Sequence, residues 1–168
     1  MTETEVVCDA GPLIHLDELS SLDLLGDFAR VWIPDAVAWE VYRHRPTVLD
    51  DPPFPARRIT TDPASSDPRL AAVSRAFSLD AGETAALRLL SQHPDALFLT
   101  DDAAARLAAK ALGVRSYGTL GILIRALRRG LRSRAEVMEL LQSIPSRSTL
   151  FLSREILDEA MRQVEAPE

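Results

Sequence analysis

The stretch "VVCDAGPLIHLDEL" (residues 6–19) predicts a buried strand that is joined to a helix through an acidic residue. The apolar run ends at Asp9, and Gly11 and Pro12 open a second apolar run. Pro12 is tolerated in the first turn of a helix, so this second run is predicted to be helical. Two interpretations of Asp9 remain open, since it is either a turn residue or a functional group held at the end of the strand.

The same pattern of strand followed by helix continues along the chain. The sequence predicts strands over 5–9, 30–34, 96–100 and 114–117, and helices over 11–19, 20–28, 35–44, 68–78, 80–93, 101–113, 118–130, 133–144 and 153–164. Ser20 is predicted to cap the second helix. The proline-rich residues 45–67 are expected to form a long surface connection that contains a short strand at "ARRIT" (56–60). This alternation predicts an α/β fold with a parallel sheet between two layers of helices.

Composition and charge narrow the class of protein. The chain has 168 residues, is 46% hydrophobic and carries a net charge of −6, which fits one globular domain and argues against nonspecific nucleic-acid binding. It has no apolar run long enough to cross a bilayer and no signal peptide, so we expect a cytoplasmic protein without membrane contact. The single cysteine, Cys8, excludes an internal disulfide and is expected in the core, and no Cys/His cluster offers a zinc site.

Acidic residues follow two of the predicted strands. Asp9 ends the first strand, and Asp101 and Asp102 follow the strand at 96–100. Ligands of parallel α/β sheets bind beyond the carboxyl ends of the strands, where all three acids are expected. A structural interpretation of the second pair remains open, because Thr100 can cap the next helix and acids in its first turn suit the helix dipole.

Two further acids lie on helices. Glu40 is predicted on the border of an apolar helix face, where its alternative role is an ion pair with an arginine. Glu83 shares a helix face with Ala86 and Leu87, but it also lies three residues after Asp80, which is the spacing of a capping box. Both roles of Glu83 therefore stay open.

Convergence of these acids would require a cation. Two carboxylates about 5 Å apart repel each other by roughly 3 kcal/mol at an effective dielectric constant of 20. Oxygen ligands without cysteine or required histidine select Mg²⁺ or Mn²⁺, and such an ion suits phosphodiester hydrolysis. The predicted catalytic residues are Asp9, Glu40, Glu83, Asp101 and Asp102, and the predicted metal ligands among them are Asp9, Glu40, Asp101 and Asp102.

Five segments in this order resemble PIN-domain proteins, in particular a prokaryotic subfamily related to VapBC-type toxins. The segments are "VVCDAGPLIHL", "VAWEV", "LDAGETAAL", "LFLTDDAAARLAAKALGV" and "GTLGILIRALRRGL", and the resemblance runs from Val6 to Ile144. It implies a PIN-like three-layer α/β/α fold with a short central parallel sheet. It also implies a single domain over residues 1–168, with the helices at 133–164 as an appendage.

The resemblance implies a function as well. Its members are Mg²⁺- or Mn²⁺-dependent endoribonucleases that cleave RNA, often as homodimers and often restrained by a small antitoxin protein. Asp9, Glu40 and Glu83 match the first three acids of the family, and the fourth falls on Asp101 or Asp102. Gly11 departs from the Ser or Thr common at its position. A catalytically silent PIN module that binds nucleic acid or protein is therefore the alternative.

A cluster of arginines follows the last predicted strand. Four of them, Arg125, Arg128, Arg129 and Arg132, are predicted to contact the RNA backbone. Their alternative role is to complement the helix C-terminus and a solvated loop. No aromatic residues are interleaved with them, so the cluster does not indicate base stacking.

Overall fold

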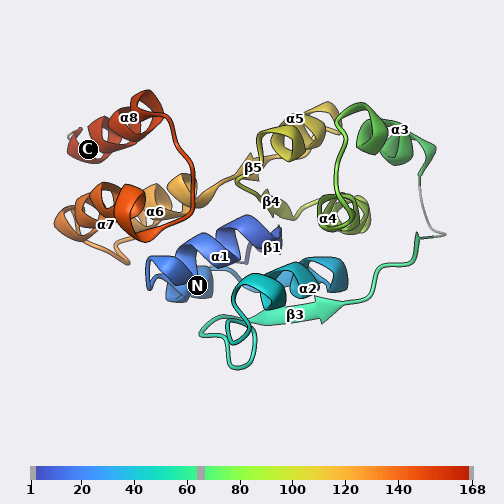
Figure 1. Cartoon of the computed structure of the whole chain (residues 1–168), viewed down its shortest axis with the longest axis horizontal. Helices are drawn as coiled ribbons and strands as arrows, with labels where there is room; N and C mark the ends of the chain where they lie inside the picture. The colour runs from blue at the N-terminus through green and yellow to red at the C-terminus, as the bar shows by residue number, and fades with distance from the viewer. Residues whose placement is uncertain (1–2, 64–66, 167–168) are drawn as a thin grey trace.

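The computed structural model describes residues 3–63 and 67–166 (Figure 1). Its strands are β1 (Glu5–Cys8), β2 (Arg30–Pro34), β3 (Ala56–Ile59), β4 (Leu97–Leu99) and β5 (Ser116–Tyr117). Its helices are α1 (Ala10–Glu18), the 3₁₀ helix η1 (Leu22–Asp27), α2 (Asp35–His44), α3 (Pro68–Ala76), α4 (Ala81–Gln92), α5 (Ala103–Ala111), α6 (Thr119–Arg128), α7 (Arg134–Arg147) and α8 (Arg154–Glu165).

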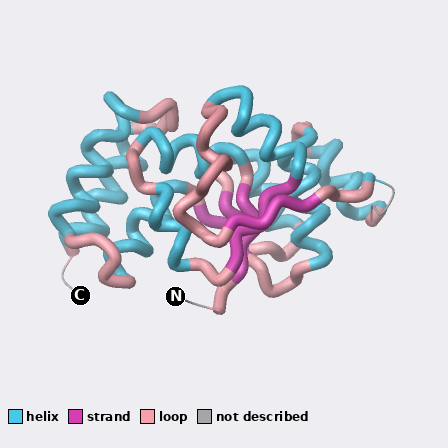
Figure 2. The backbone as a smooth tube through the Cα atoms, turned by 90° about the horizontal axis from the view of Figure 1, so that it is seen from below, coloured by secondary structure: helices cyan, strands magenta, loops and turns pink. Residues whose placement is uncertain are grey.

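The five strands form one parallel sheet in the order β3-β2-β1-β4-β5. The first strand lies in the middle, where Val7 pairs with Trp32 of β2 on one side and with Phe98 of β4 on the other. Helices surround the strands (Figure 2). The predicted α/β fold with a parallel central sheet is confirmed, and so is the short strand at residues 56–59, which forms one edge of the sheet.

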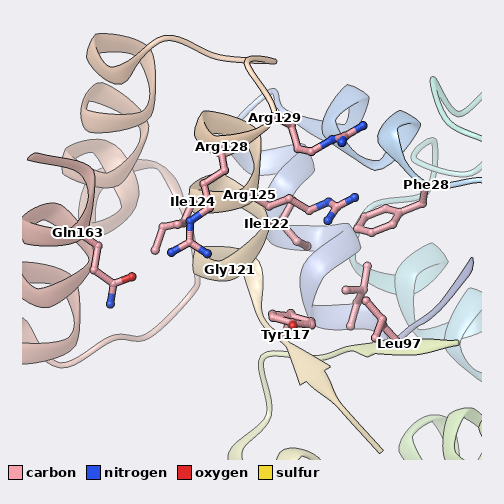
Figure 3. A pocket seen from close by; sticks show the side chains of 11 residues that line it. Phe28, Leu97, Tyr117, Gly121, Ile122, Ile124, Arg125, Arg128, Arg129 and Gln163 are labelled. Atoms are coloured by element: carbon pink, nitrogen blue, oxygen red, sulfur yellow. The ribbon is translucent and has the colours of Figure 1, made fainter. Parts of the chain in front are cut away.

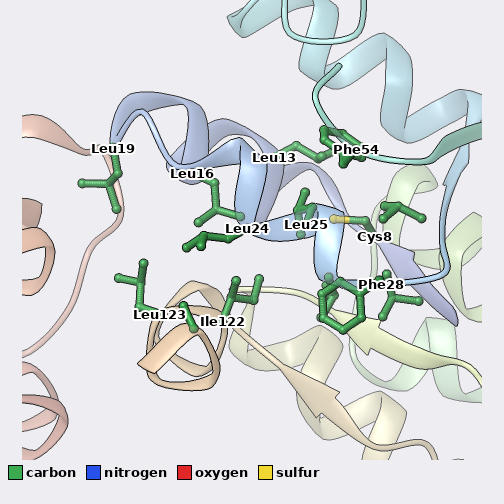
Figure 4. Packing of buried hydrophobic residues seen from close by; sticks show 14 of the residues in the cluster. Cys8, Leu13, Leu16, Leu19, Leu24, Leu25, Phe28, Phe54, Ile122 and Leu123 are labelled. Carbon is green, nitrogen blue, oxygen red and sulfur yellow. The ribbon is translucent and has the colours of Figure 1, made fainter. Parts of the chain in front are cut away.

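Side chains on the central strands alternate between two hydrophobic cores, because successive residues of a strand point to opposite faces. Val6 and Cys8 enter the core beneath α1, η1, α6, α7 and α8, whereas Val7 enters the core beneath α3, α4 and α5. The first core is the larger, and leucines of α1 and η1 lie there on the side that faces Ile122 and Leu123 of α6 (Figure 4). Helices therefore cover both faces, and Cys8 is a core residue as predicted.

The two C-terminal helices contribute to the same large core. Val137 and Leu141 of α7 and Val164 of α8 are fully buried members of this cluster. In Figure 1, α7 and α8 lie together with α6 at one end of the molecule. The division of the chain into one domain with an appendage stays a prediction. Over the residues that the model describes, none of the helices has the length and apolar character needed to cross a membrane.

Most helix ends follow the local sequence signals. The capping box of Ser133 and Glu136 is present, and Ser153 accepts a hydrogen bond from the Ile156 N–H. The predicted helix over 20–28 is instead the 3₁₀ helix Leu22–Asp27, and Ser20 does not cap it. Ser20 has a φ of 53°, a left-handed conformation that makes the turn out of α1.

One buried carboxylate ties η1 to α6. Asp27 accepts hydrogen bonds from Arg125 at 2.7 Å and from Arg129 at 3.3 Å, and only 6% of Asp27 is exposed. The Arg125 guanidinium also lies 4.9 Å from the centre of the Phe28 ring. Because a buried charge must be matched, Asp27 fixes the position of the C-terminal half of α6 against the core.

We expect Asp27→Asn to destabilise the protein by about 2 to 4 kcal/mol, because it leaves two guanidinium groups facing an uncharged buried amide. The matched control is Asp23→Asn, since Asp23 is half exposed and pairs with Arg132 on the surface. Loss of that pair should cost less than about 1 kcal/mol. Urea unfolding of the three proteins measures both effects, and equal destabilisation by the two changes would contradict the role given to Asp27.

Candidate metal centre

Acidic side chains gather at the carboxyl edge of the sheet. They come from the end of β1, from α2 and from the first residues of α4 and α5, and they are Asp9, Glu40, Asp80, Glu83 and Asp102. Each of Asp9, Glu40 and Glu83 has its pKa raised in part by the charge of at least one other member. We call these five residues the acidic cluster.

Asp9 is the most buried member of the acidic cluster, with 6% of its surface exposed. Its Oδ1 accepts a hydrogen bond from the Ala10 N–H and its Oδ2 accepts one from the Thr100 hydroxyl, both at 2.9 Å. Burial raises the pKa of Asp9 to about 6, the two hydrogen bonds oppose this rise, and the charges of Glu40 and Asp80 add to it. The carboxylate is therefore fixed in place while its ionisation is disfavoured.

Glu40 and Asp80 approach each other across Gly82. A Cβ atom on Gly82 would lie 3.4 Å from the Glu40 Oε2 and 3.5 Å from the Asp80 Oδ1. Burial and the charge of Asp80 raise the pKa of Glu40, while His44 and Arg43 lower it. The two distances from Gly82 are ordinary van der Waals distances, and they place the Glu40 carboxylate of α2 and the Asp80 carboxylate at the start of α4 on either side of the same residue.

Glu83 completes a capping box in this structure. Its side chain accepts a hydrogen bond from the Asp80 N–H at 2.9 Å, and Asp80 accepts one from the Glu83 N–H at 2.8 Å. Burial nevertheless raises the pKa of Glu83 to about 7, and the charges of Asp80, Asp102 and Asp9 add to this rise. A capping carboxylate would normally stay ionised, so the raised pKa reflects first its burial and then the acids around it.

Asp101 and Asp102 have different surroundings although they are neighbours. The carboxylate of Asp101 accepts hydrogen bonds from the Thr119 N–H and the Thr119 hydroxyl, both at 2.6 Å, and contacts the His15 Nδ1 at 2.7 Å. It thereby ties the N-terminus of α6 to α1. Gly118 is required beside it, because a Cβ there would lie 2.6 Å from the Asp101 Oδ1.

Asp102 belongs to the acidic cluster instead. It is the N-cap of α5, where its side chain accepts a hydrogen bond from the Ala105 N–H at 2.8 Å. Thr100 was considered as a possible cap of this helix; its hydroxyl accepts a hydrogen bond from the Asp102 N–H at 3.2 Å, and Asp102 is the N-cap. Because the charge of Asp102 reaches Glu83, the exposed Asp102 is the member of the pair that faces the other acids.

The donor atoms of the acidic cluster fit a hard divalent cation in their chemistry. They are carboxylate oxygens, and three of the groups have raised pKa values that a cation would lower again. The side chains do not form a complete coordination sphere: in residues 3–63 and 67–166, no three His, Cys, Asp or Glu side chains lie close enough together to hold an ion. Asp9, Glu40, Glu83 and Asp102 would supply the ligands, with Glu83 leaving its capping box to do so.

A comparison with family models decides the classification. The model described as "DUF3368: PIN domain" matches residues 5–166, which is nearly the whole chain. The chain belongs to the PIN-domain family. PIN domains are typically nucleases and generally use divalent metals. The chain matches no curated protein and no solved structure at the significance required.

Sequence reasoning missed the roles of two residues at the carboxyl edge of the sheet, Asp80 and His15. Asp80 was interpreted only as a helix cap, although its charge acts on three other acids. Its position three residues before Glu83 could have indicated both roles. The contact of His15 with Asp101 had no signal in the sequence, because 86 residues separate the two and neither belongs to a local motif.

The four predicted RNA-binding arginines lie at the opposite edge of the sheet from the acids. Arg125 and Arg129 contact Asp27, which lies just before β2 and therefore at the amino edge. Arg132 pairs with Asp23. Arg128 makes no hydrogen bond or ion pair within the described residues. With Gln163 of α8 and apolar side chains, Arg128, Arg125 and Arg129 line a cavity of about 330 Å³, and no member of the acidic cluster lines it (Figure 3).

We expect Asp9→Asn to remove a pH-dependent loss of stability in protein kept free of metal with EDTA. Below pH 3.8 the folded and unfolded chains both carry the Asp9 proton, and from there to about pH 6 only the folded chain keeps it. Wild-type stability should therefore fall relative to the variant across this window, by about 3 kcal/mol at most, and the difference should stay constant at higher pH. Urea unfolding of both proteins at several pH values measures this difference, and parallel curves would contradict it.

Glu83→Gln separates the capping role from a ligand role. Gln keeps the size of Glu and can still accept the Asp80 N–H, so the variant should be as stable as the wild type in EDTA or slightly more stable. In millimolar Mn²⁺ the wild type should gain stability by mass action, about 2.7 kcal/mol at a hundredfold excess over Kd, and the variant should gain much less. Thermal melting with EDTA and with Mn²⁺ provides the test. Identical Mn²⁺-induced shifts would leave Glu83 as a cap alone.

Proposed function

We propose that this PIN domain is a Mg²⁺- or Mn²⁺-dependent endoribonuclease that hydrolyses phosphodiester bonds of RNA at the acidic cluster. The observation that carries the proposal is the gathering of carboxylates with raised pKa values at the carboxyl edge of the sheet. Membership of a family whose members are typically nucleases supports the same reaction class.

Each residue has a distinct task in the proposed reaction. A bound divalent ion supplies an activated water and offsets negative charge that develops on the phosphate. Asp9 would hold that ion, because each of its oxygens accepts one hydrogen bond and keeps a second lone pair. Glu40 and Asp102 approach from α2 and α5. Asp101 positions α6 and α1 beside the centre through Thr119 and His15.

A catalytically silent PIN module is the second candidate. Two observations favour it: the carboxylates are not closed around a single point, and Glu83 is engaged in its capping box. Gly11 also leaves the cluster without the hydroxyl that the resemblance leads one to expect next to Asp9. Such a module would bind nucleic acid or protein at the same edge without cleaving RNA.

The biological role that we propose is that of a toxin, or of a relative of toxins, in a toxin–antitoxin pair. It rests on the resemblance of the sequence to VapBC-type proteins. A small antitoxin as partner and a homodimer as the assembly follow from the same resemblance. RNA contact by Arg125, Arg128, Arg129 and Arg132 also remains a prediction, and the absence of any ion pair on Arg128 in the described residues makes it the first of the four to test.

The decisive comparison is between the same substitution at two adjacent positions. Asp102→Asn should lower Mn²⁺-dependent RNA cleavage by about a hundredfold or more, because it removes a carboxylate ligand of the proposed divalent ion. Asp101→Asn should keep most of the activity and instead cost about 1 to 3 kcal/mol of stability, because one of its three contacts loses its acceptor. Cleavage of a labelled oligoribonucleotide and urea unfolding measure the two effects.

Asp9→Asn serves as the inactive control, since traces of contaminating ribonuclease would survive that change. Its fold should be intact, as judged by an unfolding transition at least as stable as that of the wild type without metal. Equal cleavage by Asp9→Asn and wild type in Mn²⁺ would contradict the proposed nuclease. A larger loss of activity in Asp101→Asn than in Asp102→Asn would assign the ligand role to Asp101.

A further inference from the structure

Helix α2 carries two large aromatic side chains in solvent. Trp39 is 64% exposed and Tyr42 is 56% exposed. Their ring centres lie 5.9 Å apart with an interplanar angle of 89°, so the edge of one ring meets the face of the other. Apolar surface of this size on one exposed helix face indicates a contact surface rather than a contribution to the core.

This aromatic pair stands beside the acidic cluster. Trp39 directly precedes Glu40, and consecutive Cα atoms are about 3.8 Å apart. The side chain of Glu40 turns inward toward Gly82 and Asp80, while the side chain of Trp39 turns to solvent about 100° further around the helix. A polymer bound with one of its units at the acids would therefore place a neighbouring unit against Trp39.

An exposed cation lies on the same face of α2, and its charge also acts on Glu40. Arg43 follows Trp39 by four residues and thus lies one turn further along the same side. It is exposed and makes no hydrogen bond or ion pair within the described residues. A flat aromatic surface next to an exposed guanidinium matches a nucleotide, which offers a π-face in its base and an anion in its phosphate.

We propose that Trp39, supported by Tyr42 and Arg43, forms a subsite that stacks an unpaired base of the RNA strand held at the acidic cluster. This inference rests on the proposed function and narrows its substrate to single-stranded RNA. In a duplex, each base is already stacked and paired, so its faces are not available to a side chain on the protein surface. The subsite lies on α2, and it is separate from the arginines of α6.

A protein partner fits the same surface less well. Protein interfaces also favour exposed tryptophan and tyrosine, but a partner that covered the rings would desolvate Arg43 unless it placed an acid there. That acid would stand next to Glu40 and the other carboxylates, where negative charge is already in excess. A nucleotide avoids this conflict, because a divalent ion at the cluster can offset its phosphate charge.

The test measures binding apart from cleavage. All proteins carry Asp9→Asn so that RNA stays intact, and a fluorescein-labelled 12-mer oligoribonucleotide is titrated in Mg²⁺ by anisotropy, both as a single strand and as a duplex. Trp39→Ala should weaken binding of the single strand by about tenfold or more, as expected for one lost base–aromatic stack. Trp39→Phe should keep most of the affinity, and duplex binding should be weak and insensitive to either change.

Phe151→Ala is the matched control, because Phe151 is an aromatic side chain that is 92% exposed and lies between α7 and α8. It should bind the single strand as the parent protein does. Unchanged affinity in Trp39→Ala would overturn the inference, and so would an effect of Trp39→Ala that appears only as a change in oligomer mass by light scattering. Cleavage by the protein with Asp9 intact is scored separately. Binding through Trp39 without any cleavage would contradict the proposed nuclease activity and support the stacking subsite. Cleavage together with binding that does not depend on Trp39 would support the nuclease activity and contradict the subsite.

Discussion

Repulsion among carboxylates at the carboxyl edge of the sheet is the constraint on which the rest of this structure depends. Three acids of the cluster, Asp9, Asp80 and Asp102, are the N-caps of α1, α4 and α5. A helix N-terminus offers free N–H groups and a partial positive charge, and both stabilise a carboxylate. The fold therefore holds its acids with the helix ends that the parallel sheet brings to this edge. Burial first, and the neighbouring acids in addition, raise the pKa values of Asp9 and Glu83 despite these helix ends.

For this reason, an acidic residue of this protein can cap a helix and also belong to the proposed metal site. A residue that caps a helix at the carboxyl edge of a parallel sheet is automatically aimed at the place where ligands bind. The Oδ1 of Asp102 accepts a hydrogen bond from the Ala105 N–H, and the charge of Asp102 still raises the pKa of Glu83. Helix α6 connects this edge to the opposite one, because Asp101 binds its first residue, Thr119, and Asp27 binds arginines near its end. Substitutions of Asp101 or Asp27 are thus expected to affect the position of α6.

The sequence determined most of the architecture because the relevant signals are local. Strands such as Val6–Cys8 are apolar on both faces, which is typical of the centre of a parallel sheet, and capping residues marked most helix ends correctly. Ser20 failed as a cap because a left-handed turn after α1 shifts the start of the next helix. Local rules could not separate Asp101 from Asp102, since their difference depends on His15 and Thr119, which are distant in sequence. The role of Asp80 among the acids was not predicted because its capping role already explained it. The aromatic pair on α2 has no distinct local signal, because Trp39 and Tyr42 lie on a helix face that the sequence places toward solvent.

The central claim is that the acidic cluster holds one divalent ion, and a crystal soaked in millimolar Mn²⁺ tests it most directly through anomalous scattering. The account predicts a single strong anomalous peak at the carboxyl edge of the sheet, with oxygens of Asp9 and of at least two among Glu40, Glu83 and Asp102 at about 2.0–2.6 Å. It also predicts that Asp101 keeps its bonds to Thr119 and His15. An absent peak, or a peak that lacks Asp9 among its ligands, would contradict the account.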